Sequence, residues 1–366
     1  MATKITFDQI PASIRKPTMA VEFNTKLAVR TLPTNAQKVI LIGAMAASGT
    51  AATAYQPYEI FDDAMAKVLF GASNLYGMAV AAMTANPYVR LTCLALPATG
   101  AVLQTALTAV FGADYNIYVI DSNAQADLTT LRNHLDAISH PLEQRPAIGV
   151  SAFTGTVSAG TALASALNSG RITIAWHKNS AEAVREIAAA YAAVIASEED
   201  PARPLNTLWL NGVDVNAIID RPGRTEQEVA LAGGLTPLEV GPGEKVQVVR
   251  AITTYTKNAA GANDVSLLDL TSIRTLDYVR KALVERWKLR FPRDKKTVRT
   301  KAAVRSETLD VLYKCEELEI VEAVDANKSL LIVQDNLQDP NRLDVRIPAD
   351  VVNGLHVIGG VIDMYL

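Results

Sequence analysis

Val39-Ile-Leu-Ile-Gly43 is an unbroken apolar run that ends in glycine. A short run without polar alternation is typical of a strand that is buried on both faces of a sheet. Comparable strand patterns recur at residues 89–96, 115–121, 146–151 and 171–176. Helical patterns lie between these strands, and such alternation predicts a mostly parallel α/β sheet with helices on both faces.

The length of the chain indicates more than one core. With 366 residues it exceeds an ordinary single domain, and its apolar fraction of 49% excludes global disorder. The strand–helix rhythm is lost over residues 205–243, where three prolines and six glycines predict a long excursion. We therefore expect an α/β domain over residues 21–240 and a smaller α+β C-terminal domain over residues 241–354.

The C-terminal part contains the strongest helical pattern of the chain. Apolar residues recur at three- and four-residue steps across residues 269–290, and Pro292 ends the pattern. Ser306 is the expected N-cap of a further helix that ends near Glu319. Strand patterns follow at residues 328–334 and 342–347.

Charge is unevenly divided within this part. Residues 274–305 hold twelve Lys or Arg against three acids, whereas residues 306–366 hold four basic residues against twelve acids. One interpretation is a solvated helix face, and the other is a docking surface for an acidic partner or for the acidic part of a neighbouring copy. The candidate docking residues are Arg280, Lys281, Arg286, Lys288 and Arg290.

Both ends of the chain are candidates for assembly. Residues 1–20 form an expected arm, because Pro11 and Pro17 interrupt any helix. Residues 355–366 have a strand pattern that runs to the last residue. That strand either lies in the sheet of its own domain or completes a sheet in another subunit. The candidate residues are Ile5, Phe7, Val357, Ile358, Val361 and Ile362.

The sequence contains no motif for catalysis, for a cofactor or for a metal. The four histidines lack metal-ligand spacing, and we expect a surface or capping role for His134 and His140. There is no phosphate loop and no Gly-x-Ser-x-Gly elbow. The net charge of −3 favours neither nucleic acid nor a membrane surface. The chain has only two cysteines, Cys93 and Cys315, far apart in sequence, which is typical of a protein in a reducing compartment. The N-terminus lacks the apolar core of a signal peptide, so folding in the cytoplasm is expected.

Several segments together resemble one family. Residues 253–280 are TTYTKNAAGANDVSLLDLTSIRTLDYVR, residues 339–348 are DPNRLDVRIP, residues 200–205 are DPARPL and residues 7–11 are FDQIP. These segments are similar to those of Mu-type tail sheath proteins of contractile phages, and the similarity runs in order over nearly the whole chain. The chain departs from the family between Leu96 and Leu107, where an outward-facing inserted domain is usual, so this insert is expected to be short or missing near residues 97–105.

The resemblance implies a subtilisin-like three-layer domain without its catalytic residues. It also implies a C-terminal domain that faces the tail tube, and terminal arms that add strands to neighbouring subunits. The implied protein is not an enzyme. It polymerises helically, contracts, and meets tube, baseplate and tail terminator proteins in a virion tail that is assembled in the host cytoplasm.

Two alternatives remain open. An α/β enzyme would bind a nucleotide or a small acid at the ends of its parallel strands. A baseplate or other tail assembly protein would form a small ring instead of a long helix.

Overall fold

A computed structural model describes residues 32–365 of the chain. The chain divides into two compact units, Met1–Thr34 and Asn35–Leu366, and every element described below belongs to the second. The expected N-terminal arm over residues 1–20, with Ile5 and Phe7, lies outside the described residues.

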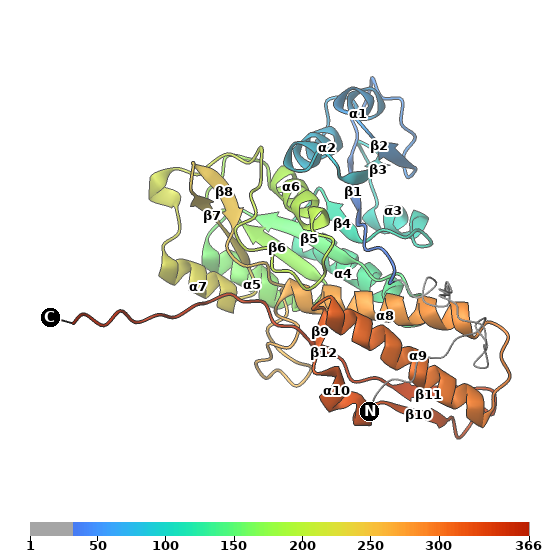
Figure 1. Ribbon diagram of the computed structural model, residues 1–366. Coiled ribbons are helices and arrows are strands. Elements are labelled where there is room, and N and C mark those ends of the chain that lie inside the picture. The colour runs from blue at the N-terminus through green and yellow to red at the C-terminus, as the bar shows by residue number, and fades with distance from the viewer. Residues whose placement is uncertain (1–31, 366) are drawn as a thin grey trace, which may run out of the picture. The chain divides into compact units, whose positions relative to one another are not determined.

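The second unit is built on one eight-stranded sheet, in the order β2-β3-β1-β4-β5-β6-β7-β8 (Figure 1). Neighbouring strands from β3 to β7 pair in parallel, and only the edge strands β2 and β8 are antiparallel. The prediction of a mostly parallel sheet is thereby confirmed. The strands are β1 (Lys38–Ala44), β2 (Pro57–Ile60), β3 (Arg90–Leu96), β4 (Ile117–Ile120), β5 (Ile148–Phe153), β6 (Ile172–Trp176), β7 (Thr236–Gly241) and β8 (Lys245–Val248).

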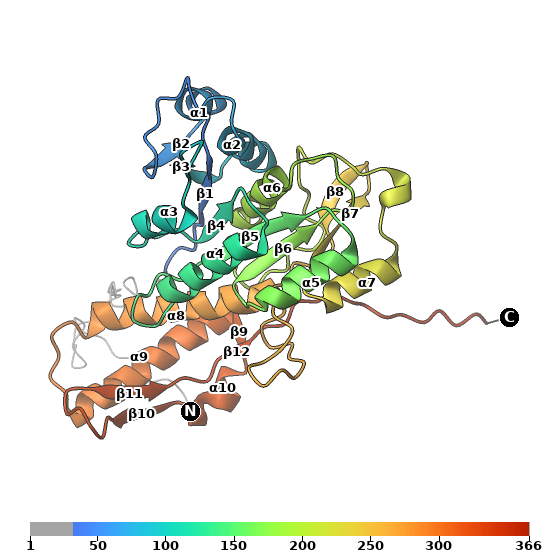
Figure 2. The same cartoon turned by 180° about the vertical axis from the view of Figure 1, so that it is seen from behind.

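Helices cover both faces of the sheet, as Figures 1 and 2 show from opposite sides. On β1, Val39 and Leu41 enter one apolar core, whereas Ile40 and Ile42 enter the other. Because successive side chains of a strand point to opposite faces, the run must be apolar throughout. The helices of this part are α1 (Asp63–Phe70), α2 (Asn74–Ala85), α3 (Leu103–Ala109), α4 (Gln125–Ile138), α5 (Val157–Leu167), α6 (Val184–Ser197) and α7 (Arg224–Ala232).

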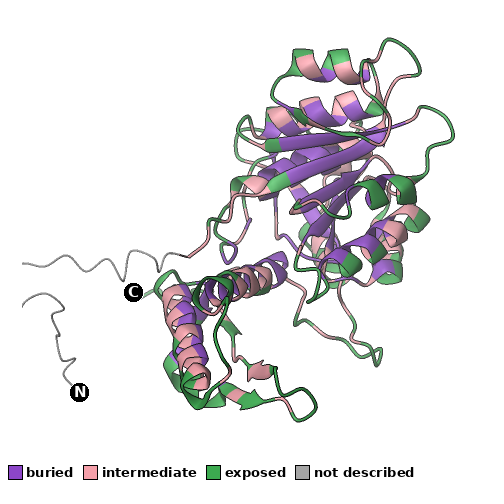
Figure 3. Ribbon diagram, turned by 90° about the vertical axis from the view of Figure 1, so that its right-hand side faces the viewer, coloured by how far each residue is buried: buried purple, intermediate pink, exposed green. Residues whose placement is uncertain are grey.

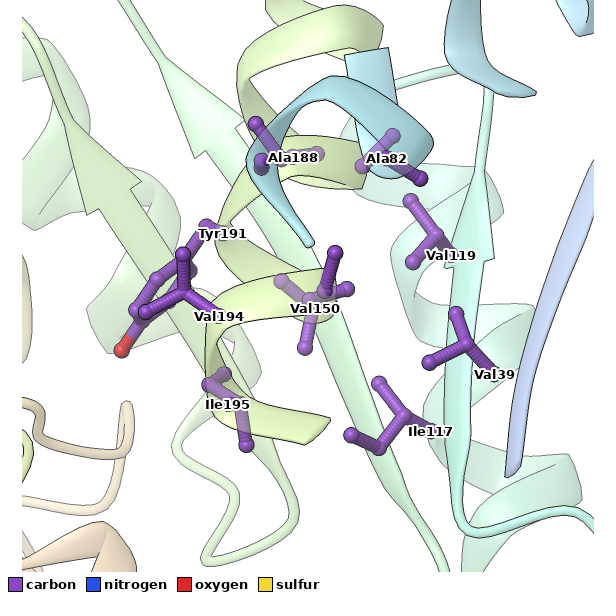
Figure 4. Packing of buried hydrophobic residues seen from close by; sticks show 14 of the residues in the cluster. Val39, Ala82, Ile117, Val119, Val150, Ala188, Tyr191, Val194 and Ile195 are labelled. Atoms are coloured by element: carbon purple, nitrogen blue, oxygen red, sulfur yellow. The ribbon is translucent and has the colours of Figure 1, made fainter. Parts of the chain in front are cut away.

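Small side chains allow α2 and α6, which cover the same face of the sheet, to pack closely together. Helix α6 is buried along most of its length, and α2 packs directly against it. Figure 4 shows Ala82 of α2 and Ala188 of α6 above Val119 and Val150 of the sheet. The alanine enrichment of residues 181–197 therefore reflects close packing of helix on helix.

The segment expected to be an excursion, residues 205–243, is more regular than predicted. It contains a short 3-10 helix, η2 (Ile218–Asp220), as well as α7 and β7. The expected domain boundary after residue 240 falls within the β7–β8 hairpin, because β8 pairs with β7. Thr236 accepts a hydrogen bond from the Ile252 N–H at 2.9 Å, so the chain stays attached to the sheet beyond β8.

A helical hairpin dominates the C-terminal part of the chain. It consists of α8 (Leu270–Arg290) and α9 (Val298–Glu317), which pack against each other. Helix α9 begins earlier than the expected start at Ser306. Its N-cap is Thr297, whose hydroxyl accepts a hydrogen bond from the Thr300 N–H at 3.2 Å. Residues 298–305, which precede the expected start, are therefore helical.

Two small antiparallel sheets follow, β10–β11 and β12–β9. Their elements are β9 (Val321–Glu322), α10 (Val324–Asn327), η3 (Lys328–Leu330), β10 (Ile332–Asp335), β11 (Leu343–Arg346) and β12 (Asp350–Val351). From 352 to 365 the chain forms no helix or strand. The alternative that residues 355–365 lie in a sheet of their own chain is therefore wrong for the part that the structure describes.

Candidate assembly surfaces

Arg286 is the centre of the contact between α8 and α9. Its side chain is 4% exposed and donates to Glu307 and Asp310, at 3.2 Å in each case. Two neighbouring cations join this network, since Arg290 lies 3.2 Å from Glu307 and Lys314 lies 3.5 Å from Asp310. In this conformation Arg286 therefore holds two helices together and is not accessible to a partner, which differs from its expected role in docking.

Much of the remaining basic segment is also paired within the chain. Lys296 and Lys301 contact the two carboxylate oxygens of Asp335 at 3.1 and 2.6 Å. Arg305 donates to the carbonyl oxygens of Lys328 and Leu331. The acidic and basic parts of the sequence thus neutralise each other across α9 and β10. Neither the solvated helix face nor the docking surface, the two interpretations of the uneven charge, included such pairing within the chain.

Three of the five candidate docking residues line one groove between α8 and residues 114–116 and 144–146, and the acids Asp114 and Glu285 also line it. Arg280, Lys281 and Lys288 border a groove of about 190 Å³ together with Arg145. Arg280 donates to Asp277 at 3.0 Å and to the Ser139 carbonyl at 2.7 Å, and Lys288 donates to Gln144 at 3.0 Å. Arg145 was missed because it lies far from the basic run in sequence, and only the fold brings it to α8.

The C-terminal segment is held to the body at His356 and exposed beyond it. His356 Nδ1 lies 2.9 Å from the side-chain amide nitrogen of Asn206, and its Nε2 lies 3.5 Å from Asp269. Arg250 binds the same Asp269 through two hydrogen bonds of 2.8 Å. Burial, reinforced by Arg250 and opposed by Asp269, lowers the pKa of His356. The neutral imidazole is therefore the form that anchors the segment at neutral pH.

The candidate residues after this anchor are exposed apolar side chains. Val357, Ile358, Val361 and Ile362 are 81, 83, 87 and 98% exposed, respectively. Among the described residues, no further strand pairs with the outer edges of the β10–β11 and β12–β9 sheets. Exposed apolar segments and open strand edges are sites at which another chain can bind.

Among the groups that usually carry chemistry, His134, Cys93 and Cys315 are buried. His134 is packed between Phe111 and Tyr118, with ring centroids 5.9 and 5.4 Å away, so the expected surface or capping role is wrong for this residue. His140 is exposed and accepts from the Leu142 N–H. Burial raises the pKa of the Cys315 thiol to about 11 and raises that of Cys93 as well, so neither is a thiolate at neutral pH.

Neither a metal cluster nor a membrane helix is found in the described part of the chain. Residues 32–365 bring no three His, Cys, Asp or Glu side chains into an arrangement that could bind a metal ion. Within the same residues, every helix is too short or too polar to cross a bilayer.

Comparisons with known proteins lead to one family. The profile of the phage tail sheath protein central domain matches residues 97–254, and that of the phage tail sheath C-terminal domain matches residues 262–364. The Mu-like prophage FluMu tail sheath protein of Haemophilus influenzae is 30% identical over 278 residues. This match covers 72% of the chain and 57% of that relative, so the chain spans a little over half of the relative's length.

Solved structures of sheath proteins share the fold. The sheath tail protein of Desulfitobacterium hafniense is 12% identical with a TM-score of 0.67, over 92% of this chain and 97% of that one. A contracted sheath complex of an extracellular contractile injection system is 12% identical with a TM-score of 0.66, over 96% and 98%. Together with the two matched domains, these findings confirm the resemblance seen in the sequence. The chain belongs to the phage tail sheath protein family.

Proposed function

We propose that this chain is the structural subunit of a contractile tail sheath. In this proposal it polymerises helically around the tail tube and contracts to drive the tube through the host envelope. The observation that supports this proposal most directly is the exposed apolar segment after His356. Within residues 32–365, the two small sheets also have unpaired outer edges. The family and the contracted sheath with the same fold support the proposal.

The arms are proposed to link neighbouring subunits by strand addition. The ten residues after His356 reach at most about 33 Å when extended, which is enough to cross to an adjacent chain. Pairing with the free edge of β11 or β12 would satisfy their backbone groups and cover the four apolar side chains Val357, Ile358, Val361 and Ile362. Residues 1–20, with Ile5 and Phe7, are proposed to do the same at the other end of the chain.

Further partners follow from the same assignment. The groove lined by Arg145, Arg280, Lys281 and Lys288 is proposed to face an acidic surface of the tube protein. Baseplate and tail terminator proteins would end the helix, and the sheath would be assembled in the host cytoplasm as part of the virion tail. We also propose that the α/β domain is subtilisin-like without catalysis, since His134 and Cys93 are buried within it.

The test is electron microscopy of tubes formed by the purified chain. Wild-type protein is expected to give long hollow tubes, and deletion of residues 357–366 is expected to leave a folded monomer without tubes. A matched control replaces the exposed Val68 and Val229 by Ser, which removes apolar surface elsewhere. Tubes from the deletion variant would overturn the strand-addition proposal, and uniform small rings from the wild type would favour a baseplate component.

A further inference from the structure

The two ends of the α8–α9 hairpin carry opposite charges that nothing in the described chain neutralises. Arg293, Lys295 and Arg299 are exposed where α8 leads into α9, and we name them the basic tip. Glu317, Glu319 and Glu322 are exposed where α9 leads into β9, and we name them the acidic end. Within residues 32–365 none of these six side chains has a hydrogen bond or an ion pair, unlike Lys296 and Lys301 beside them.

This distribution of charge is unfavourable for the chain by itself. Arg299 lies in the first turn of α9 and Glu317 in its last, which is the reverse of what a helix dipole favours. In the small sheet, Glu322 lies directly opposite Asp350, and like charges in that position repel. Stability of the monomer therefore does not account for these side chains.

Each end also presents an apolar side chain beside its charges. Val298 is 79% exposed at the basic tip, and Leu318 is 56% exposed at the acidic end. Figure 3 shows buried, intermediate and exposed residues along both helices of the α8–α9 hairpin. A small apolar centre with a charged rim is the usual composition of a protein interface.

The two ends cannot neutralise each other within one chain. A helix of the length of α9 spans about 30 Å, far beyond the reach of an ion pair. They are complementary between chains, since the basic tip keeps an excess of cations over the exposed Asp294 that lies between Arg293 and Lys295, and the acidic end carries three unpartnered acids among the described residues. Two different surfaces that match on copies of one chain give a head-to-tail contact, which produces an open helical polymer.

We propose that the acidic end of one copy docks on the basic tip of the next copy in the sheath. The occupant is a second copy of this chain, because both halves of the complementary pair are present on it. This inference rests on the proposed function, and it adds an electrostatic contact to the contact proposed for the arms. Because exposed charges are screened by salt, assembly is expected to weaken as the ionic strength rises.

The test uses two charge-reversal variants of the full chain. The first carries Glu317→Lys, Glu319→Lys and Glu322→Lys, and the second carries Arg293→Glu, Lys295→Glu and Arg299→Glu. Each alone is expected to raise the concentration needed for tubes by at least about tenfold. An equimolar mixture is expected to form tubes near the wild-type concentration. The first variant then carries two basic surfaces and the second carries two acidic surfaces, so the two variants can alternate along the polymer with opposite charges at each contact.

Folding of the variants is checked separately. Both variants are expected to melt at or above the wild-type temperature, since the new charges favour the helix dipole. A control for the first variant carries the same change of net charge at exposed acids elsewhere, Glu59→Lys, Glu199→Lys and Glu228→Lys, and is expected to assemble normally.

Two outcomes would overturn the inference. One is assembly of either triple variant at the wild-type concentration, and the other is failure of the mixture to restore tubes. Failure of the wild-type chain to form tubes under any condition would count against the proposed function instead, so the two failures are distinguishable.

Discussion

His134 is a buried base without a hydrogen-bond partner for Nε2 among the described residues. Its ring packs edge-on against Phe111 and Tyr118, and burial lowers its pKa from 6.5 to about 4. The unfolded chain therefore binds a proton near pH 6.5 that the folded chain does not accept until about pH 4. Stability from this residue is complete above pH 6.5 and falls as the pH is lowered toward 4.

We expect a difference between wild type and His134→Leu that depends on pH. At neutral pH the variant changes only packing, but below it the wild type loses up to about 3 kcal/mol more than the variant. Urea unfolding of the monomer at several pH values measures the difference. His140→Leu is the control, because His140 is exposed. Parallel pH curves for wild type and His134→Leu would contradict the assignment.

At the scale of elements, Arg286 joins α8 to α9. Substitution by Met leaves Glu307 and Asp310 partly buried without their shared cation, and we expect the free energy of unfolding to fall by about 3 kcal/mol. Adding Glu307→Gln and Asp310→Asn is expected to recover part of this loss. The matched control Arg299→Met removes an exposed arginine and is expected to change stability by less than about 0.5 kcal/mol. Equal effects at Arg286 and Arg299, measured by urea unfolding, would contradict a structural role for Arg286.

Elements with a strong local pattern were predictable from the sequence. The run at residues 39–43 became β1, and the pattern at 171–176 became β6, because an apolar stretch of that length is buried wherever the chain folds. The start of α9 was not predictable by this means. Its first two turns carry three charged residues among small and apolar ones, and they are held by Lys296 and Lys301 on Asp335, a contact that local periodicity does not reveal.

The same distinction applies to the candidate sites. Counting charges located the basic segment, but it could not separate Arg286, which is buried, from Arg293, which is exposed. Exposure depends on which helix packs on which, and ion pairing depends on residues that are distant in sequence. The C-terminal residues were predicted to form a strand, but the structure describes no strand over residues 352–365, and their pairing with another subunit stays a prediction. Their anchor at His356 required the positions of Asn206 and Asp269, which the sequence pattern does not give.

At the scale of the whole molecule, the proposed assembly predicts a change in protease sensitivity at the C-terminal end. Leu355 is 72% exposed and Tyr365 is 92% exposed, so chymotrypsin is expected to cut at this end of the isolated chain. In tubes the same bonds are expected to be protected, because a strand added to a neighbour's sheet has its backbone paired. Mass spectrometry of both forms at one protease ratio measures the rate of loss. Equal rates in monomer and tube would show that residues 357–365 stay free in the polymer, and the contact between subunits would then have to come from rigid surfaces such as the two ends of the α8–α9 hairpin.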